Sequence, residues 1–153
     1  MRLTLSIGRR SSSRRRLRED RSLLNALLET VDVAIVACAA DGRLTHANRR
    51  ACELIGADCS LGTAPETWIR TLRPRTPSGI ALPFEDLPPV RALQGEMLRG
   101  VDVLVSIRDR DVLLSATASP ALDPTGRPGG ALVLLEDVTE QRRSEAGRRQ
   151  GGP

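Results

Sequence analysis

The chain is poor in several residue types, and each shortage excludes a class of protein. Its 153 residues include one Trp, one Phe, one His and neither Tyr nor Lys. No apolar run approaches the roughly 20 residues of a membrane-spanning helix, and the N-terminal stretch MRLTLSIGRR lacks the apolar segment of a secretory signal. The sequence therefore predicts a cytoplasmic protein, with no membrane association, whose core is built from aliphatic side chains.

Metal sites and catalytic sites also lack candidate residues. The cysteines Cys38, Cys52 and Cys59 contain no CxxC pair, and one His cannot complete with them an organised four-ligand zinc site. A single His likewise leaves no converging Ser-His-Asp set, and no phosphate-binding loop occurs. We interpret Asp109 and Asp111 as solvated turn residues. The sequence predicts no metal, no catalytic residue and no enzymatic activity.

The basic charge is concentrated at the ends of the chain. Residues 1–21 contain eight Arg and two acidic residues, whereas residues 22–139 contain 11 Arg and 15 acidic residues. We interpret residues 1–16 as a disordered, solvated tail. Nucleic-acid binding through this tail is a weaker alternative, because such binding needs a basic face with base-reading or stacking side chains. All 23 basic residues are Arg, which we interpret as the coding bias of a GC-rich, actinobacterial genome.

Residues 17–32 carry one apolar stripe at helical spacing. Its members recur at intervals of seven, four and three residues, at Leu17, Leu24, Leu28 and Val31. This spacing predicts a helix that flanks the folded domain and packs on a sheet or on a second copy of itself. Since an exposed apolar stripe marks an interface, we expect these four residues to form a dimer helix.

The next segment predicts a hairpin followed by a short helix. Residues 33–39 form an apolar strand candidate, and residues 43–47 form its return strand. Asp41-Gly42 lies between them and favours a two-residue turn with positive φ angles. Asn48 then follows as the N-cap of the helix.

The second half of the chain predicts one helix and three strands. After an irregular stretch, Asp86 is expected to cap a helix within residues 85–98, which Gly95 can end early. Apolar residues alternate over 101–108 and again over 112–119, which predicts an antiparallel hairpin with one buried face. The last strand is predicted over residues 130–136, where both faces are apolar.

This last strand continues directly into a charged helix. Asp137 offers an N-cap oxygen, and Glu140 lies three residues further on, at the spacing of a capping box. Residues 138–153 are expected to hold this exit helix and a disordered C-terminus. A junction of this kind can carry a change in the sheet to whatever the helix pairs with.

These segments together resemble the PAS family of sensor domains. The resemblance rests on AADGRLTHANRRACELIG at residues 39–56, TPSGIALPFEDLPPVRALQGE at residues 76–96 and GALVLLEDVTEQRR at residues 130–143. It implies an α+β fold, the PAS fold, whose five-stranded antiparallel sheet contains two strands, then helices, then three strands along the chain. Helices would flank the sheet at both ends, and the PAS domain itself would span residues 33–137.

The resemblance also implies roles for individual residues. Asp41, Gly42 and Asn48 would be structural, and Asp137, Val138 and Thr139 would form the signal junction. Sheet and helices would enclose a pocket, whose side chains either surround a small, mostly apolar ligand or simply fill the core. The candidate lining residues are Trp68, Ile69, Leu72, Phe84, Val90, Leu93, Val103, Val105, Ala116, Leu132 and Leu134.

The cofactor-binding branches of the family have residues that this chain lacks. The axial His of haem-binding members lies on the helix predicted within 85–98, which contains no His. His46 lies elsewhere and is expected to be exposed or locally bonded. The Asn-Cys-Arg photoadduct motif of the flavin-binding members has no match, the nearest stretch being residues 48–52. We predict that neither haem nor flavin is bound.

The resemblance implies a PAS sensor or interaction module in bacterial signal transduction, as in two-component systems. It would sense a small ligand or a partner and relay the signal through its flanking helices. We expect a homodimer, or a heterodimer with another PAS or signalling protein. A ligand-free structural heterodimerisation partner is the main alternative. The chain would act alone or derive from a longer multidomain protein.

Overall fold

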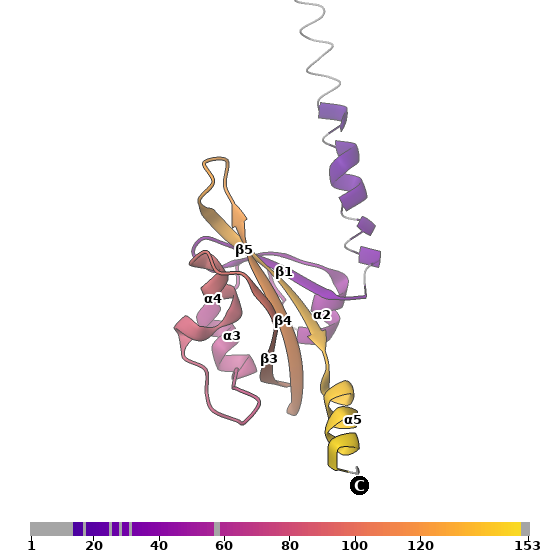
Figure 1. The fold of residues 1–153 in the computed structure, drawn as a ribbon. Helices are drawn as coiled ribbons and strands as arrows, with labels where there is room; N and C mark the ends of the chain where they lie inside the picture. Colours follow the sequence, from indigo (N-terminus) through magenta and orange to yellow (C-terminus); the bar gives the residue numbers. More distant parts are fainter. Residues whose placement is uncertain are drawn as a thin grey trace, which may run out of the picture. The chain divides into compact units, whose positions relative to one another are not determined.

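The computed structural model divides the chain into two compact units, residues 1–32 and 33–153. It describes residues 14–16, 18–24, 26–27, 29–30, 32–56 and 59–150, without the side chains of residues 148–150. The described residues between Arg14 and Thr30 are helical (Figure 1). Of the predicted dimer stripe, Leu24 lies on this segment, whereas Leu17, Leu28 and Val31 lie outside the described residues.

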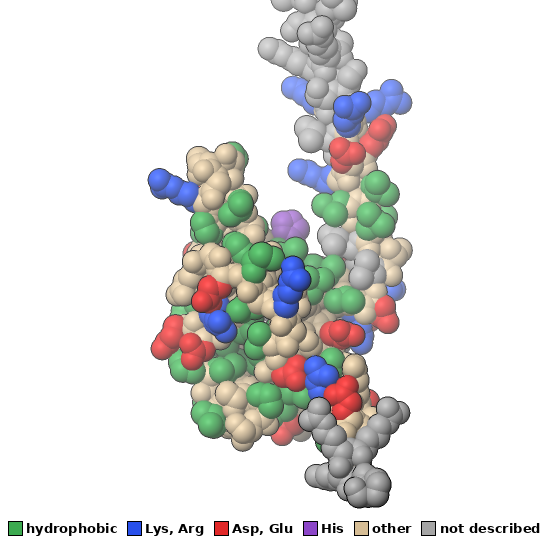
Figure 2. Space-filling model, in the orientation of Figure 1, with side chains coloured by type: hydrophobic (Ala, Val, Ile, Leu, Met, Phe, Trp, Pro, Cys, Tyr) green, Lys and Arg blue, Asp and Glu red, His purple; other side chains and the backbone are tan. Residues whose placement is uncertain are grey.

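Helical structure in the first unit begins earlier than the sequence predicts. Residues 14–16 are helical, although the charge pattern predicts disorder up to residue 16. Arg has a high helix propensity, and Arg15 Nε lies 3.5 Å from Glu19 Oε1 one turn later. Leu23, Leu24 and Leu27 on this segment are all more than half exposed, and Figure 2 shows apolar side chains there among charged ones.

The second unit begins with a hairpin formed by β1 (Ala34–Ala39) and β2 (Leu44–Ala47). Its turn has three residues, not the predicted two: the Gly42 N–H donates to the Ala39 carbonyl at 2.8 Å, and the Ala39 N–H donates to the Arg43 carbonyl at 2.9 Å. Within the turn only Gly42 has a positive φ, of 85°. A three-residue loop needs one left-handed residue, whereas the two-residue type I′ turn needs two.

Gly42 is also required for space. A Cβ atom at this position would lie 2.6 Å from Cγ of Pro65, which begins the later helix α3 (Pro65–Leu72). Asp41 supports the same turn, because its Oδ1 accepts the Arg43 N–H at 3.0 Å. The two residues are thus structural, although in a different turn from the one predicted.

Short helices connect β2 to the rest of the sheet. Helix α2 (Arg49–Ile55) begins at Asn48, whose Oδ1 accepts the Ala51 N–H at 2.9 Å, so the predicted N-cap is confirmed. Helix α3 follows, then the 3₁₀ turn η1 (Phe84–Asp86) and helix α4 (Pro88–Leu93).

The helix predicted within residues 85–98 begins later than predicted, and it ends before Gly95, as the prediction allowed. Asp86 belongs to η1, and the N-cap position of α4 is Leu87, which makes no side-chain cap. Pro88 opens the helix, because a missing N–H costs least in the first turn. Gly95, with a φ of 98°, turns the chain after the last helical residue.

Three long strands complete the sheet: β3 (Leu98–Ile107), β4 (Arg110–Leu122) and β5 (Pro128–Asp137). All pairings are antiparallel, and the strand order is β2-β1-β5-β4-β3. The α+β architecture and the order of elements are therefore as predicted. A two-residue turn joins β3 to β4, where Arg108 and Asp109 both have positive φ, of 52° and 63°.

One face of this sheet is covered by helices. Figure 1 shows α3 and α4 together beside the sheet, and α5 (Thr139–Gln150) continuing from the end of β5. The predicted alternation along the β3–β4 hairpin is confirmed, because its buried positions alternate with less buried ones. These buried residues are Val103, Val105, Ile107, Leu114, Ala116 and Ala118.

Candidate functional site

A cavity of about 110 Å³ lies between the inner face of the sheet and the connecting helices. Each sheet strand contributes to its wall, and α2, α3 and the start of α4 contribute from the helical side. None of the lining side chains carries a charge. The volume is smaller than the roughly 150 Å³ of an apolar cavity that binds benzene or xenon. The site therefore suits one small apolar molecule.

Six of the eleven predicted lining residues line this cavity. Trp68, Ile69 and Leu72 lie on one face of α3, and the others alternate along β3 and β4. Together the six are Trp68, Ile69, Leu72, Val103, Val105 and Ala116. They share a helical or strand period with the buried face, in agreement with the lining that the resemblance implies.

The other five predicted residues do not line the cavity. Phe84 is 45% exposed on η1. Val90 is buried and Leu93 is half-buried on α4, whose first residues, Leu87 to Pro89, meet the cavity instead.

On β5 the predicted lining is displaced by one residue. Leu132 and Leu134 lie on the opposite face, and Val133 and Leu135 line the cavity. Because side chains alternate between faces along a strand, a one-residue error transfers the whole set to the other side. Leu132 is accordingly 40% exposed.

Sequence reasoning missed the contribution of the first hairpin. Val36 and Cys38 of β1 and Leu44 of β2 line the cavity. Their two-residue spacing on β1 is the signal that could have placed them. Cys38 is buried, and burial raises the pKa of its thiol despite a backbone hydrogen bond from Ala131. Its thiol therefore stays protonated and neutral in the wall at neutral pH.

Asn48 holds the first hairpin to α2 from inside. Besides capping α2, its Oδ1 accepts the Ile35 N–H at 2.9 Å, and its Nδ2 donates to the Val33 carbonyl at 2.8 Å. Its own N–H donates to the Ile35 carbonyl at 3.0 Å. Asn48 is 4% exposed, so these bonds replace all of the water that its amide would otherwise bind. The residue ties together three elements: both strands of the hairpin and α2.

The predicted signal junction is anchored to β4. The Val138 N–H donates to the Leu113 carbonyl at 2.9 Å, and Thr139 Oγ1 accepts the Leu113 N–H at 2.9 Å. Thr139 donates in turn from its backbone N–H, at 3.0 Å, and from Oγ1, at 2.7 Å, to Asp137 Oδ1. Val138 is buried. The start of α5 is therefore fixed to one residue of β4.

The predicted capping box at this junction is wrong. Helix α5 begins at Thr139, so Val138 occupies the N-cap position, and its carbonyl accepts the Arg142 N–H at 2.9 Å. Asp137 lies one residue earlier and binds the first N–H of the helix. Glu140 is therefore one position short of the capping-box spacing from Val138.

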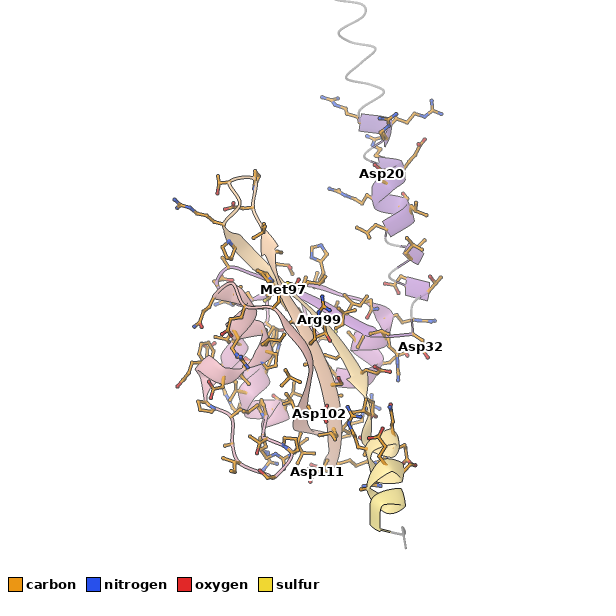
Figure 3. The ribbon with its side chains drawn as sticks, in the orientation of Figure 1. Asp20, Asp32, Met97, Arg99, Asp102 and Asp111 are labelled. Atoms are coloured by element: carbon orange, nitrogen blue, oxygen red, sulfur yellow. The ribbon has the colours of Figure 1, made fainter. Side chains whose placement is uncertain are left out.

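An ion pair supports the first turn of α5 from β3. Arg142 Nε lies 3.0 Å from Asp102 Oδ2, and Arg142 Nη2 lies 3.4 Å from Asp102 Oδ1. Figure 3 labels Asp102 on the sheet, near the start of α5. The hydrogen bond to this carboxylate, and then its charge, raise the pKa of the Arg142 guanidinium. The helix is thus joined to the sheet at two strands.

His46 has only a local contact, and no metal site or membrane-spanning helix is found among the described residues. His46 is exposed, and its Nδ1 lies 3.1 Å from Thr45 Oγ1, as expected of a locally bonded residue. No group of three or more potential metal ligands occurs within the described part of the chain. Among the helices described, none is long and apolar enough to cross a membrane.

Comparison with known families decides the assignment. A sequence profile described as the PAS fold matches residues 28–143, which is most of the chain. The chain belongs to the PAS family. A search among curated proteins finds no match. The resemblance that the sequence motifs carry is therefore confirmed at the level of the family.

Solved structures show the same fold at low sequence identity. The PAS domain of an HTR-like protein from Haloarcula marismortui is 23% identical, with a TM-score of 0.58, over 83% of this chain and 98% of that one. An RNA-binding light-oxygen-voltage receptor is 22% identical, with a TM-score of 0.61, over 85% of this chain and 36% of that one.

A third structure is the E. coli DhaR(N)–DhaL complex. Its matching chain is 20% identical, with a TM-score of 0.53, over 82% of this chain and 38% of that one. This PAS chain thus spans little more than a third of two of the three proteins. At these identities the likeness establishes the fold alone.

Proposed function

We propose that this PAS domain is a sensor module that binds a small apolar molecule in its cavity and relays binding through β5 to α5. One observation carries the proposal: β5 both lines the cavity and ends in the junction with α5. Leu135 lines the cavity, and Asp137 follows two residues later on β5. A displacement of Leu135 by a ligand can therefore reach Asp137 along the backbone of β5.

The neighbouring strand strengthens this coupling. Ala116 pairs with Leu135, and Leu114 pairs with Asp137, and both of these β4 residues line the cavity. Leu113, the next residue on β4, holds Val138 and Thr139. A ligand that moves residues 113–116 of β4 would consequently act on Asp137 at the end of β5 and on Val138 and Thr139 at the start of α5.

The size of the cavity also supports the absence of haem and flavin. A flavin carries three fused rings, whereas a cavity of about 110 Å³ has room for about one xenon atom or one small ring. No catalytic set is proposed, because the lining offers no acid, base or charged group. The domain would act by changing its contacts and not by chemistry on the ligand.

Benzene and xenon are suitable probes, because the natural ligand is not needed to test the cavity. Trp68, which is the chain's one tryptophan, lines it and reports occupancy through its fluorescence. Benzene should change Trp68 emission and raise the free energy of unfolding as its concentration exceeds its Kd. It should also change hydrogen exchange at the amides of Val138 to Arg142.

Ala116→Leu fills the cavity and should abolish all three responses. Ser119→Leu is the matched control, because Ser119 lies on the same strand and the opposite face, opposite Leu132. A wild-type protein that ignores both probes would contradict ligand binding. Binding that leaves the exchange of α5 unchanged would contradict the relay.

The first unit favours a second role, self-association. Leu23, Leu24 and Leu27 are 61%, 55% and 52% exposed on its helical segment. Pairing with the same helix of a second copy would bury them, and the hydrophobic gain is about 25 cal/mol per Å² removed from water. Sedimentation should show a dimer for the wild type and a monomer for Leu24→Asp/Leu27→Asp. Equal sedimentation of the two proteins would exclude this helix as the interface.

A further inference from the structure

Two cysteines seven residues apart meet beside the cavity, and one of them, Cys59, lines it. Cys52 lies on α2, and the chain turns back after the helix at Gly56, whose φ is 86°. The Gly56 N–H donates to the Cys52 carbonyl at 2.8 Å, and the Cys59 N–H donates to the Gly56 carbonyl at 3.3 Å. This returning chain places Cys59 beside Cys52.

The two thiols are in direct contact. The Cys52 thiol donates to Cys59 Sγ, and the two sulfur atoms lie 2.7 Å apart. Both cysteines are free thiols; Cys52 is exposed, whereas Cys59 is half-buried and lines the cavity. Cys38, the third thiol, is buried on β1 and takes no part in this contact. An S–S bond of about 2.0 Å is therefore within reach of a small side-chain movement.

We propose that Cys52 and Cys59 are a redox modification site, at which a low-molecular-weight disulfide converts the two thiols into one reversible intramolecular disulfide. The Cys52 thiolate attacks one sulfur of the small disulfide and releases one small thiol. The Cys59 thiolate then attacks Cys52 Sγ of the mixed disulfide and releases the second small thiol. Two protein thiols are oxidised, and the small disulfide is reduced to two thiols.

Exposure determines the order of these two steps. Burial, followed by the hydrogen bond and the charge interaction with Cys52, raises the pKa of Cys59 to about 12. Because the thiolate is the nucleophile, the exposed Cys52 reacts first. Once Cys52 is held in a mixed disulfide, its hydrogen bond and its charge interaction with Cys59, both of which raise the pKa of Cys59, are gone. The pKa of Cys59 then falls, which favours the closing step.

The disulfide would act on the cavity wall. Ile55 and Cys59 both line the cavity, and they lie within the loop that a Cys52–Cys59 bond closes. Oxidation would fix this part of the wall to α2, and reduction would release it. This effect on the cavity rests on the proposed function, because it treats the cavity as the sensing site. The formation of the disulfide does not depend on that function.

Trypsin separates the three thiols conveniently. Cleavage after Arg50 and Arg70 gives one peptide, residues 51–70, with both Cys52 and Cys59, and Cys38 lies in the peptide of residues 22–43. The full chain is treated with oxidised glutathione, and the remaining thiols are alkylated without reduction. Peptide 51–70 should be two hydrogen atoms lighter and carry no alkyl group, while Cys38 is alkylated on unfolding. Dithiothreitol should restore both thiols.

Single variants separate the two steps. Cys59→Ser should accumulate a glutathione adduct on Cys52, because the resolving thiol is missing. Cys38→Ser should form the disulfide as the wild type does. Stable glutathione adducts on both thiols of the wild type, or a disulfide-linked dimer in place of the internal bond, would overturn the proposal.

Trp68 emission of the oxidised and reduced proteins tests the consequence without any ligand. If oxidation changes Trp68 emission in the wild type and in Cys38→Ser, the disulfide alters the cavity wall. The same treatment should leave the emission of Cys52→Ser/Cys59→Ser unchanged. Identical emission after complete oxidation would overturn that link. Failure of benzene to bind either redox form would contradict the proposed function and leave the peptide result to decide the redox site.

Discussion

Two strand-to-helix junctions of this domain use similar chemistry in opposite surroundings. At the first, Asn48 Oδ1 accepts the N–H groups of Ile35 and Ala51 from a position that is 4% exposed. At the second, Asp137 Oδ1 accepts the N–H and O–H groups of Thr139 while exposed to solvent. Burial makes the first bonds costly to lose, because an unpaired buried polar group has no water to replace its partner.

The second junction can exchange its bonds with water at little cost. Both junctions follow a strand that lines the cavity, β2 at Leu44 and β5 at Leu135. Neither Asn48 nor Asp137 lines it, so burial is what distinguishes the two junctions. The first junction is therefore suited to holding the fold, and the second to changing in response to a ligand. The following predictions test this difference.

The largest effect is expected for Asn48→Ala. This change leaves the N–H groups of Ile35 and Ala51 and the carbonyl of Val33 without their side-chain partner. The free energy of unfolding should fall by about 3 kcal/mol, as measured by urea denaturation. Asn48→Asp keeps the accepting oxygen but turns a second oxygen toward the Val33 carbonyl at a buried position, so it should also destabilise the domain. A loss below about 1 kcal/mol, the value of one hydrogen bond, would remove the contrast between the junctions.

A smaller effect is expected for Thr139→Val. The substitution preserves shape and removes the hydroxyl that accepts the Leu113 N–H, so stability should fall by about 1 kcal/mol. Hydrogen exchange at the Leu113 amide should become faster, whereas exchange at Ile35 should not. Thr139→Ser retains the hydroxyl and serves as the control. Slow exchange at the Leu113 amide in Thr139→Val would mean that this N–H is protected by something other than the Thr139 hydroxyl.

Asp137→Ala should lower the free energy of unfolding by less, about 0.5 kcal/mol. The side chain is exposed, so water can replace the hydrogen bonds that it makes. The effect of the substitution on function should exceed its effect on folding. The benzene-induced change in exchange over residues 138–142 should weaken, while the Trp68 response to benzene stays intact. Loss of the Trp68 response would show that Asp137 shapes the cavity itself.

The smallest effect concerns salt. The Arg142–Asp102 pair is partly exposed, so added salt should screen it. Raising ionic strength should speed hydrogen exchange in the first turn of α5 and leave the amide of Ala51 in α2 unchanged. Arg142→Gln should remove the salt dependence. Equal salt effects on both helices would indicate a general change in stability and no separate response of α5.

The sequence predicted those features that one stretch of chain settles alone. Alternation along β3 and β4 identified their buried face, and the position of Asn48 before a helical pattern identified a cap. On β5 the same reasoning failed, because residues 131–135 are apolar at every position and have no polar phase to read. Pairing decides the phase: Val36 stands opposite Val133, and Ala116 stands opposite Leu135, so the cavity takes the odd-numbered residues.

The β1–β2 and β3–β4 turns also show that strand pairing can override the preference of the local sequence. Asp41-Gly42 predicts a two-residue turn, yet the β1–β2 register and the approach of Pro65 select a three-residue loop. The two-residue turn with both φ angles positive occurs at Arg108-Asp109, where neither residue is glycine. There the register of two long strands determines the turn, although the local preference of Arg108 opposes a left-handed conformation.

By itself, the sequence determined the family, the order of the elements and an aliphatic core, since these depend on local periodicity and on turn and cap residues. Only the tertiary structure decided which face of β5 meets the cavity, how Thr139 binds β4, and that Cys52 meets Cys59. Each of these features depends on contacts between segments that strand pairing, or a turn of the chain, brings together. Local pattern carries no information on such contacts, because the partner is chosen by the packing of the whole sheet.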